Sequence, residues 1–562
     1  MFSPRDPHVL YFSSQVLFRT ADDGNSWQAI SPDLTREDPG VPSNLDPSTA
    51  ADGPKGKRRG VIYTIAPSPV ESGEIWVGTD DGLIHRTDDE GKTWIDVTPP
   101  ELTPWSKVTH IEASHFRAAT AYAAIDRHRL DDQRPYLYRT RNFGKNWELV
   151  SKGIPEGSFL NCVREDPVRE GLLYACTEKG VYVSIDGGDN WQSLALNLPV
   201  TSARDLVVHE DDLVVATFGR GFWVLDDITP LRQFNPQIAS RETWLFRPET
   251  AYRVRQGRDQ GTELPSDEPQ AANPPEGAVI DYYLREKPAG PAELEIFDAD
   301  GKLVRRFSSD DKFPKTNPAD VPFPIDWVHE PEPLAAGAGM HRFIWDLRYA
   351  LPQGVRDSRW RPQTVFALPG SYTVKLTANG RSSAQPLTVV LDPRVKVPQE
   401  ALVRQFELAS RLSAKLGEAS VANQQFGALE KQTAERKREL APNSELEKLL
   451  DAFQKKWAWA AAVETGEDFM GLGISLPEKH PEPLGQVVLA LGTLVSSVES
   501  ADAAPTADMS TASEAWLGAA DEAVRRWQAF LKNDLAAVNG ELQKANQKPL
   551  VVTVNTQTDP SE

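Results

Sequence analysis

The densest group of residues able to do chemistry lies between positions 110 and 132. It contains two histidines around a carboxylate, followed by arginines, a histidine and aspartates that could bind a polar or charged ligand. A metal site is not favoured, because His110-x-Glu112-x-x-His115 lacks the spacing that places two histidines on one helix face. The residues from Asp126 onward occupy a long insertion between strands, which makes it the candidate ligand-binding loop, without a metal or cofactor. A solvated loop braced by Arg–Asp pairs is the more common arrangement for such residues. The candidate binding residues are His115, Arg117, Asp126, Arg127, His128, Arg129, Asp132 and, from a later turn, Arg220.

The elements that would position these residues are indicated by a repeat. Four copies of the eight-residue box S/T-x-D-x-G-x-x-W begin at Thr20, Thr87, Thr140 and Ser184, and the third has Asn in place of Asp. A short carboxylate or amide can accept N–H groups two or three residues on in a turn, Gly tolerates a positive φ, and Trp brings a large apolar surface. Four equivalent turns on separate hairpins cannot all face one substrate, so we predict a structural role for these side chains. They are Asp22, Gly24, Trp27, Asp89, Gly91, Trp94, Asn142, Gly144, Trp147, Asp186, Gly188 and Trp191.

The boxes alternate with short strand-like segments, four to a repeat, which is typical of a β-propeller blade with the box between its third and fourth strands. Before the first box there is room for only two strands, in residues 8–13 and 15–20. The last repeat, residues 205–226, has three strands and no box. We therefore expect about four to five blades within residues 1–230, entered in mid-blade, as in the truncated beginning of a longer protein.

The rest of the chain changes character three times. Residues 231–276 are rich in Pro, Gln and Asp and are predicted to be a linker. About seven short strands in residues 277–395 predict an immunoglobulin-like sandwich. Residues 396–548 carry apolar residues at helical spacing, which predicts a bundle of about four helices with a capping box at Ser444 and Glu447, before a tail at residues 549–562. The predicted fold class is multidomain and mainly β, with a C-terminal α-helical bundle.

Composition excludes several classes of partner. The 562 residues include 81 acidic and 61 basic side chains, a net charge of −20, which disfavours nucleic acid and anionic membrane surfaces. No apolar run is long enough to insert into a membrane, and no secretory signal opens the chain. Cys162 and Cys176 flank a turn symmetrically, so they should be cross-strand neighbours. Two buried thiols are favoured over a disulfide, which would be strained there.

The boxes resemble the Asp-box, or bacterial neuraminidase repeat, of propellers found in sialidases, xyloglucanases, sortilin-type receptors and photosystem assembly factors. A wider resemblance links the chain to the C-terminal half of large exported bacterial proteins of the sortilin-like or glycosyl-hydrolase-like repeat type. It rests on residues 10–12, 30–36, 75–82, 121–132 and 216–223. The resemblance implies a propeller, a sandwich and a helical tail in that order, and export from a bacterial cell to the periplasm or exterior. It does not imply a defined activity.

Two functions of different class follow. The first is a non-enzymatic binding or scaffold protein that recognises a polypeptide or a glycan through propeller loops. The alternative is a carbohydrate-active glycoside hydrolase, sialidase- or xyloglucanase-like, which needs two carboxylates about 5–10 Å apart across a cleft. Asp80, Asp81, Asp126 and the pair Asp226–Asp227 are available, but no pair stands out and the Arg-Ile-Pro signature of sialidases is absent. We therefore expect binding rather than catalysis.

Overall fold

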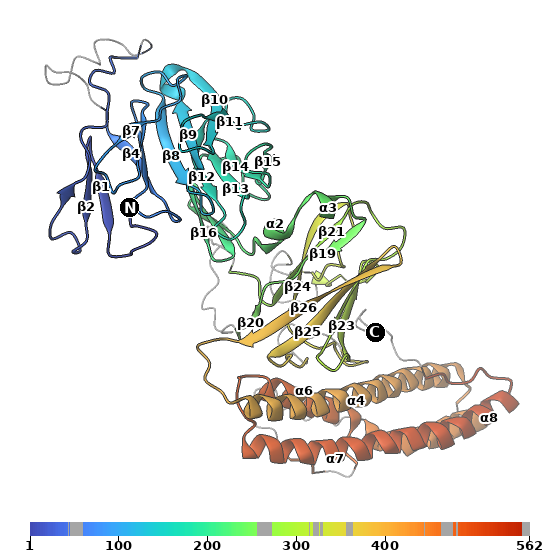
Figure 1. Cartoon of the computed structure of the whole chain (residues 1–562). Coiled ribbons are helices and arrows are strands. Elements are labelled where there is room, and N and C mark those ends of the chain that lie inside the picture. Colours follow the sequence, from blue (N-terminus) through green and yellow to red (C-terminus); the bar gives the residue numbers. More distant parts are fainter. Residues whose placement is uncertain are drawn as a thin grey trace. The chain divides into compact units, whose positions relative to one another are not determined.

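The computed structural model describes residues 1–42, 44, 60–255, 273–313, 315–318, 325, 330–355, 364–442, 444–461, 476–478 and 481–552. The chain is mainly β, with many small antiparallel sheets and a C-terminal helical region (Figure 1). It divides into two compact units, residues 1–239 and 240–562, which we call unit 1 and unit 2.

The described part of unit 1 contains five consecutive antiparallel sheets, each a simple meander. Sheet 1 is β1 (Leu10–Ser13), β2 (Leu17–Thr20) and β3 (Gln28–Ala29). Sheet 2 is β4 (Ile62–Pro67), β5 (Ile75–Thr79), β6 (Ile84–Thr87) and β7 (Ile95–Asp96). Sheet 3 is β8 (Lys107–Ala113), β9 (Ala121–Arg127), β10 (Asp132–Thr140) and β11 (Glu148–Leu149). Sheet 4 is β12 (Leu160–Glu165), β13 (Leu173–Thr177), β14 (Gly180–Ser184) and β15 (Gln192–Ser193), and sheet 5 is β16 (Ala203–His209), β17 (Asp212–Thr217) and β18 (Phe222–Leu225).

Each pair of successive sheets encloses its own small apolar core. Leu17 and Val77 are buried between sheets 1 and 2, Trp76 and Ile111 between sheets 2 and 3, and Val163 between sheets 3 and 4. Burial of such surface stabilises by roughly 25 cal/mol per Å². Contacts between sheets are made mainly by their first and second strands, β4 with β8, β8 with β12 and β12 with β16, so successive sheets are joined through these strands.

The first strand of sheets 2 to 5 carries a register irregularity at the same place. The pairing with the second strand skips one residue near the start of β4, β8, β12 and β16. Such a bulge bends the strand and re-aims the extra side chain. The four bulge residues are Tyr63, Thr109, Asn161 and Arg204.

The predicted cysteine arrangement is confirmed. Cys162 on β12 and Cys176 on β13 are paired directly across the two strands. Both thiols are free and buried between sheets 4 and 5. Burial raises the pKa of the Cys176 thiol well above its usual value, and its hydrogen bond with Cys162 adds to that rise. Both cysteines therefore act as small apolar core residues.

Part of the predicted linker is ordered structure. Within residues 231–276 the chain forms the end of α2 (Thr229–Gln233), α3 (Pro236–Ala239), β19 (Thr243–Leu245) and β20 (Ala251–Arg253). These segments are too short to be recognised locally, and β20 is fixed by parallel pairing with the distant strand β26 (Arg381–Leu391). Residues 256–272 of the predicted linker lie outside the described residues.

Unit 2 begins with two sheets around one core. The first is ordered β19, β21 (Ala278–Leu284) and β24 (Gly339–Trp345). The second is ordered β20, β26, β25 (Gly370–Ala378), β22 (Glu293–Phe297) and β23 (Leu303–Ser308). Tyr282 and Trp345 from the first sheet and Val374 from the second are buried in the shared core. The described residues between 277 and 395 therefore form a β-sandwich, which is completed by two strands from the preceding segment.

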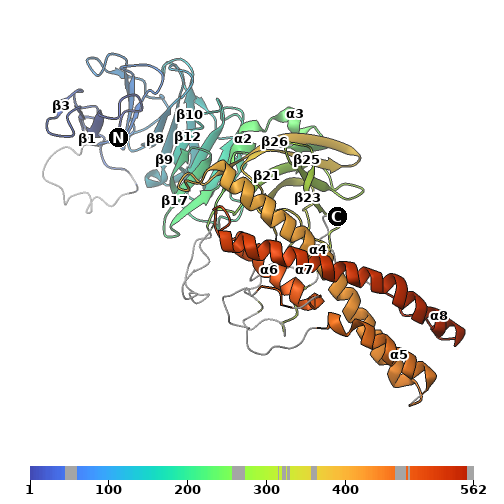
Figure 2. The same cartoon turned by 90° about the horizontal axis from the view of Figure 1, so that it is seen from below.

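The helical region follows as α4 (Gln399–Glu439), α5 (Glu445–Trp457), α6 (Leu484–Val498) and α7 (Ala507–Phe530), which continues through a π-helical turn into α8 (Ala536–Lys544). Helix α4 packs against α6 and α7, and α4 and α7 cross one another in Figure 2. The predicted cap is confirmed, because the Glu447 N–H donates to Ser444 Oγ at 3.2 Å. The predicted tail is partly packed: Leu550 is buried in the helical core, and residues 553–562 lie outside the described part of the chain. No described helix is long and apolar enough to cross a membrane.

Candidate functional site

Strand direction divides the surface of unit 1 into two ends. Turns from first to second strand and the four boxes lie at one end, which we call the box end. Turns from second to third strand, and connections from one sheet to the next, lie at the other, which we call the loop end. In sheet 3, Lys107 pairs with Asp126 at the loop end, whereas Ala113 pairs with Ala121 at the box end. The seven residues of β8 separate the ends by about 20 Å. The predicted cluster is therefore not one site, because its two halves lie at opposite ends of the sheet.

The box-end half is an ion network that joins sheets. His115 Nε2 lies 3.3 Å from Glu112 Oε1, which also accepts the Glu165 N–H at 3.1 Å. Arg164 on β12 reaches Glu112 at 3.5 Å and Asp205 on β16 at 3.0 Å. The hydrogen bond to Glu112 raises the pKa of His115, although burial opposes it. Burial alone would raise the pKa of Glu112, but the hydrogen bond from His115 and nearby positive charges outweigh it and lower that pKa.

His110 on β8 is held neutral beside this network. Burial and the positive charge of Arg164 lower the pKa of His110 to about 4. Its Nδ1 atom is buried and has no hydrogen-bond partner among the described residues. Within the part of the chain that the structure describes, no group of three or more His, Cys, Asp or Glu side chains is arranged to hold a metal ion. Arg117, the last predicted member of this half, is exposed and pairs with Glu170.

The loop-end half surrounds the turn between β9 and β10. We expected a long insertion here, but the strands continue through most of it and leave only a short turn, η1 (His128–Leu130), with Asp131 at φ 60°. Buried Asp126 accepts the backbone N–H of His128 at 2.8 Å and binds its ring Nδ1 at 2.6 Å. The His128 ring stacks on Phe159, with centroids 5.0 Å apart. Arg129 is exposed at the tip of the turn.

Asp132 organises the second part of this turn. It accepts Arg134 at 2.9 Å and the Tyr136 hydroxyl at 2.7 Å, and Arg127 lies 3.3 Å away. The hydrogen bond from Arg134 lowers the pKa of Asp132 well below its usual range, with support from Tyr136. Arg127 and Arg134 lie 5.3 and 5.4 Å from the centroid of the Tyr136 ring. The Asp132 carboxylate is thus occupied by bonds within the turn. The side chains of the turn that remain available to a ligand are the two arginines and the Tyr136 ring.

Two further cation–aromatic pairs at the loop end escaped the sequence analysis. Lys107 Nζ lies 3.4 Å from the centroid of the Tyr63 ring, and Arg204 lies 5.2 Å from that of Phe218. Tyr63 and Arg204 are both bulge residues. The sequence signal that could have identified them is their equivalent position near the start of the first strand of each sheet. We call the set the aromatic–basic row: Tyr63, Lys107, Arg127, Arg134, Tyr136, Arg204 and Phe218.

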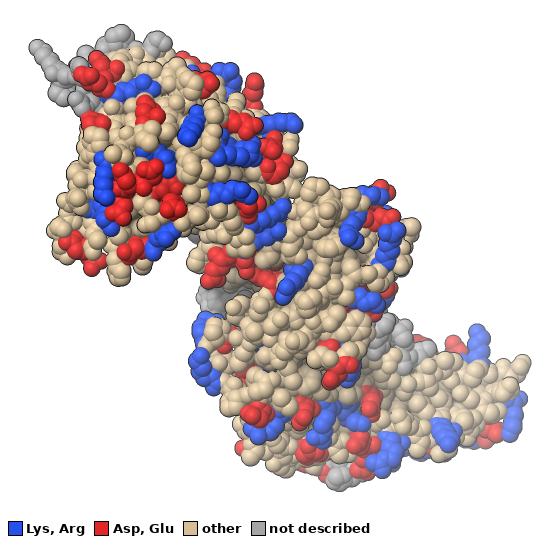
Figure 3. All heavy atoms as spheres, in the orientation of Figure 1, with Lys and Arg blue, Asp and Glu red and all other residues tan. Residues whose placement is uncertain are grey.

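Arg220 lies beside this row in the turn between β17 and β18. Gly219 and Gly221 on either side have φ of 84° and 69°. The carbonyl of Arg220 accepts the indole N–H of Trp223 at 3.0 Å, and its side chain is exposed. Basic and acidic side chains are interspersed on the face of unit 1 that Figure 3 shows, so that face is not uniformly negative.

The carboxylates considered for hydrolysis hold turns. Asp80 accepts the Val61 N–H at 2.7 Å, and Asp227 accepts the Thr229 N–H at 2.9 Å. Asp81 is fully buried, accepting the Thr79 hydroxyl at 2.5 Å and the Arg36 N–H at 2.8 Å. A carboxylate that must accept such bonds to keep a turn closed is poorly available as a catalytic acid or nucleophile.

The four boxes share one internal geometry. In the first, the Thr20 hydroxyl donates to Asp22 at 2.7 Å and accepts the Gly24 N–H at 3.1 Å, while Asp22 accepts the Ser26 N–H at 2.9 Å. The side chain therefore reaches four residues on, further than expected. Asn142 makes the same bonds in the third box, to Thr140 at 3.1 Å and Asn146 at 3.0 Å.

Three of the four boxes also bind the preceding sheet. The indole N–H groups of Trp94, Trp147 and Trp191 donate to the carbonyls of Ile30, Val97 and Val150 at 2.9, 2.7 and 2.7 Å. Each acceptor is the aliphatic residue that follows the last strand of the sheet before. The box side chains are thus engaged in turn closure and sheet packing.

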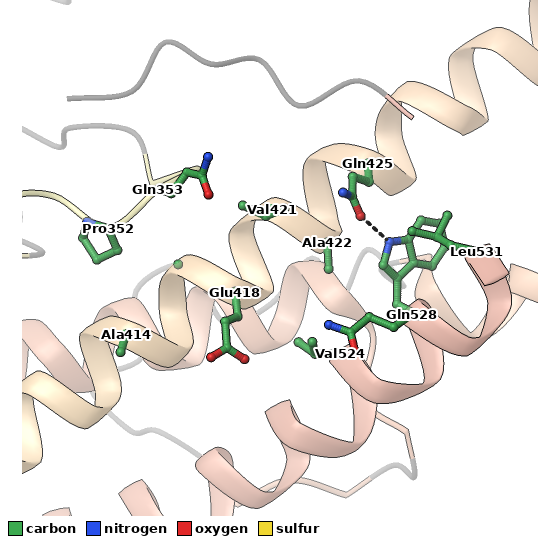
Figure 4. Close-up of a pocket in the computed structure, with 12 residues that line it drawn as sticks. Pro352, Gln353, Ala414, Glu418, Val421, Ala422, Gln425, Val524, Gln528 and Leu531 are labelled. Atoms are coloured by element: carbon green, nitrogen blue, oxygen red, sulfur yellow. Dashed lines mark hydrogen bonds between the residues drawn. The ribbon is translucent and has the colours of Figure 1, made fainter. Parts of the chain in front are cut away.

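Unit 2 contains a separate cavity of about 390 Å³ between α4, α7 and residues 352–353 (Figure 4). Gln425 Oε1 in its wall accepts the indole N–H of Trp527 at 2.9 Å. Glu418 is paired with Lys415 at 2.7 Å. Gln425 and Glu418 are thus engaged in local contacts, and we regard the cavity as a packing gap between helices.

Comparison with known proteins assigns no family. No family model matches the chain, and no curated protein matches it. Among solved structures it is similar to an ancestral GH74 enzyme (16% identity, TM-score 0.28, covering 54% of this chain and 37% of the other). It is similar to the GH74 xyloglucanase from Xanthomonas campestris (11% identity, TM-score 0.28, covering 69% of this chain and 44% of the other). It is also similar to YCF48 from Cyanidioschyzon merolae (14% identity, TM-score 0.23, covering 59% of this chain and 85% of the other). The chain spans less than half of either GH74 enzyme. At these TM-scores the likenesses define no activity.

Proposed function

We propose that the protein is a non-enzymatic binding or scaffold protein of the exported, sortilin-like repeat type, which takes a polypeptide or glycan at the loop end of unit 1. The aromatic–basic row is the observation that carries this proposal. Tyr63 is 53% exposed and Phe218 is 72% exposed, although both are large apolar side chains. Exposed aromatic rings flanked by guanidinium or ammonium groups are typical of recognition surfaces, since they combine apolar area with hydrogen-bond donors.

The five sheets of unit 1 are, in this proposal, Asp-box propeller blades, and the sandwich of unit 2 is immunoglobulin-like. Joining of the sheets at their first strands supports the first assignment, since propeller blades fan out from a shared inner edge. In a propeller, the row would lie on the face formed by second-to-third strand turns, where loops vary without disturbing the blades. The basic members of the row favour ligands with carboxylates or other anionic groups.

Binding is tested first with the full chain on glycan and peptide arrays, scored for ligands rich in carboxylates. A Tyr63→Ser/Arg134→Ser double variant should then bind the selected ligand at least about tenfold more weakly, because it loses one ring and one cation of the row. Val70→Ser, a change at the box end where Val70 is 37% exposed, is the matched control. Unchanged binding by the folded double variant would remove the row from the ligand site.

The alternative, a glycoside hydrolase, is tested on the same preparation. Release of reducing ends is measured from xyloglucan and from a panel of aryl-glycosides. Because Asp80, Asp81 and Asp126 are engaged in structural bonds, we expect no sustained turnover. Turnover that is lost on replacing one of these carboxylates by its amide would establish the enzyme instead.

A further inference from the structure

Sheet 5 lacks the strand that completes the other sheets. Sheets 1 to 4 each end in a strand of two residues, β3, β7, β11 or β15, paired antiparallel to the strand before it. In sheet 5 the order is β16, β17, β18, and no strand of the described residues pairs with the outer edge of β18. That edge presents unused backbone donors and acceptors.

The register identifies the backbone groups on that edge. The Thr217 N–H donates to the Gly221 carbonyl at 3.1 Å, so Thr217 and Gly221 bond across the turn. In an antiparallel pair, bonded and non-bonded positions alternate. Trp223 and Leu225, paired with Val215 and Leu213, therefore bond toward β17. Phe222 and Val224 direct their N–H and C=O groups to the open edge.

The side chains beside this edge are apolar and exposed. Phe222 is 79% exposed, Val224 52% and, on the same sheet face, Val207 53%. The opposite face, with Leu206, Leu213 and Val215, is buried against sheet 4. Exposed contiguous apolar surface next to an open strand edge is characteristic of a docking site for an extended segment.

The other sheets define what fits the vacant position. Their last strands lie within the sequence aromatic-x-x-aliphatic, in which the two middle residues form the strand. The aliphatic residue of sheets 1 to 3 accepts an indole N–H from the next box. Leu194, its counterpart in sheet 4, receives no indole donor from the described residues. The four segments are Trp27–Ile30, Trp94–Val97, Trp147–Val150 and Trp191–Leu194.

We propose that β18 is the docking edge for an extended segment of a partner polypeptide with the sequence aromatic-x-x-aliphatic. The segment adds antiparallel to β18 as the fourth strand of sheet 5, bonds to the backbone of Phe222 and Val224, and directs its aromatic ring toward the Leu194 carbonyl. A second copy of this chain is not the occupant, since β18 has only four residues and a β18–β18 pair would bury far less than the roughly 1,200 Å² of a stable interface. This goes beyond the proposed function, because it assigns a polypeptide ligand to an edge distinct from Tyr63 and Arg134.

The probe is a fluorescent peptide with the sequence of residues 146–152, Asn-Trp-Glu-Leu-Val-Ser-Lys, titrated with the full chain and followed by anisotropy. Val224→Pro removes one outward N–H, which an edge strand tolerates, whereas Val224→Thr keeps it. We expect saturable binding to the unaltered chain and to Val224→Thr, and at least about tenfold weaker binding to Val224→Pro and Phe222→Asp. Circular dichroism establishes that each variant is folded.

Three results would overturn the proposal. They are equal binding of the peptide to folded Val224→Pro, equal binding of a scrambled peptide, and absence of binding at about millimolar chain concentration. A dimer of the unaltered chain that Val224→Pro abolishes would assign the edge to a second copy. Tyr63→Ser/Arg134→Ser should leave peptide binding unchanged, so failure of the row and failure of the edge are read separately.

Discussion

The first box and the three boxes that follow have nearly the same sequence but different surroundings. Trp191 is 4% exposed and its indole N–H is bonded to the sheet before it, whereas Trp27 is 43% exposed and packs on Phe12 at 6.0 Å. A Cβ on Gly91 would lie 2.3 Å from the Ile30 carbonyl oxygen, whereas one on Gly24 would meet only its own tryptophan at 3.9 Å. The comparison separates two roles: Thr, Asp and Gly close the local turn, and Trp and Gly seat that turn on a neighbouring sheet.

The largest contrast is expected for the tryptophans. Trp191→Ala removes a buried ring and its bond to Val150, and should destabilise sheets 3 and 4 by about 3–5 kcal/mol. Trp27→Ala should cost less than about 1 kcal/mol, as for exposed positions. Native-state hydrogen exchange, measured by mass spectrometry, gives the opening free energy of each sheet. Equal losses of opening free energy in the two variants would mean that a box whose tryptophan bonds to the preceding sheet is no different from a box whose tryptophan does not.

A smaller contrast is expected for the glycines. Gly91→Ala adds a clash with the Ile30 carbonyl to the strain of a φ of 91°, and should cost about 3 kcal/mol. Gly24→Ala at a φ of 86° has the strain alone, about 1 kcal/mol. The same exchange measurement on sheets 1 and 2 separates them. If both cost the same, close approach to the neighbouring sheet adds nothing to the requirement for glycine.

Replacement of a box aspartate by asparagine should have little effect, because the third box has Asn142 at the equivalent position. Asp186 accepts the Ser184 hydroxyl at 2.8 Å and the Asn190 N–H at 2.9 Å, bonds that an amide oxygen can also accept. Asp186→Asn should therefore change the opening free energy of sheet 4 by a few tenths of a kcal/mol, and Asp186→Ala should cost about 1 kcal/mol. Equal losses in both variants would mean that the negative charge, not hydrogen-bond acceptance, closes the turn.

The smallest effect is expected from acid. Hydrogen bonds from Ser26 lower the pKa of Asp22 to about 2, and those from Thr93 lower that of Asp89 to about 2. Since the folded-state pKa lies below the ordinary value, the stabilisation is complete above about pH 4 and is lost as pH falls toward 2. The opening free energy of sheets 1 and 2 should therefore fall more steeply over that window in the unaltered chain than in Asp22→Asn/Asp89→Asn, in which these positions do not titrate. A steeper loss in the double variant would contradict the pKa direction.

Features set by residues close in sequence were predictable. The box turns close within four residues, the Ser444 cap spans three, and the cysteine pair follows from a hairpin register. Features set by distant partners were not. The cluster between 110 and 132 divides because β9 runs from the box end to the loop end between its two halves, and β20 is a strand because β26 lies beside it. The aromatic–basic row required the bulges, which place Tyr63 and Arg204 where no local pattern indicates binding.

In the described part of unit 1, side-chain hydrogen bonds link each sheet to the next one along the chain, and this arrangement affects how unit 1 unfolds. The indole bonds join sheets 1–2, 2–3 and 3–4, and the side chains of Thr109 and Asn161 donate to the Leu160 and Ala203 carbonyls of the next sheet. Such a stack behaves as a one-dimensional series of couplings, which frays from its ends before its middle opens. Sheet 5 is the last of the five described sheets, and no indole hydrogen bond from a box joins it to sheet 4. A strand that docks on β18 would therefore be felt first as a slower opening of sheet 5, with a smaller effect on each sheet further along.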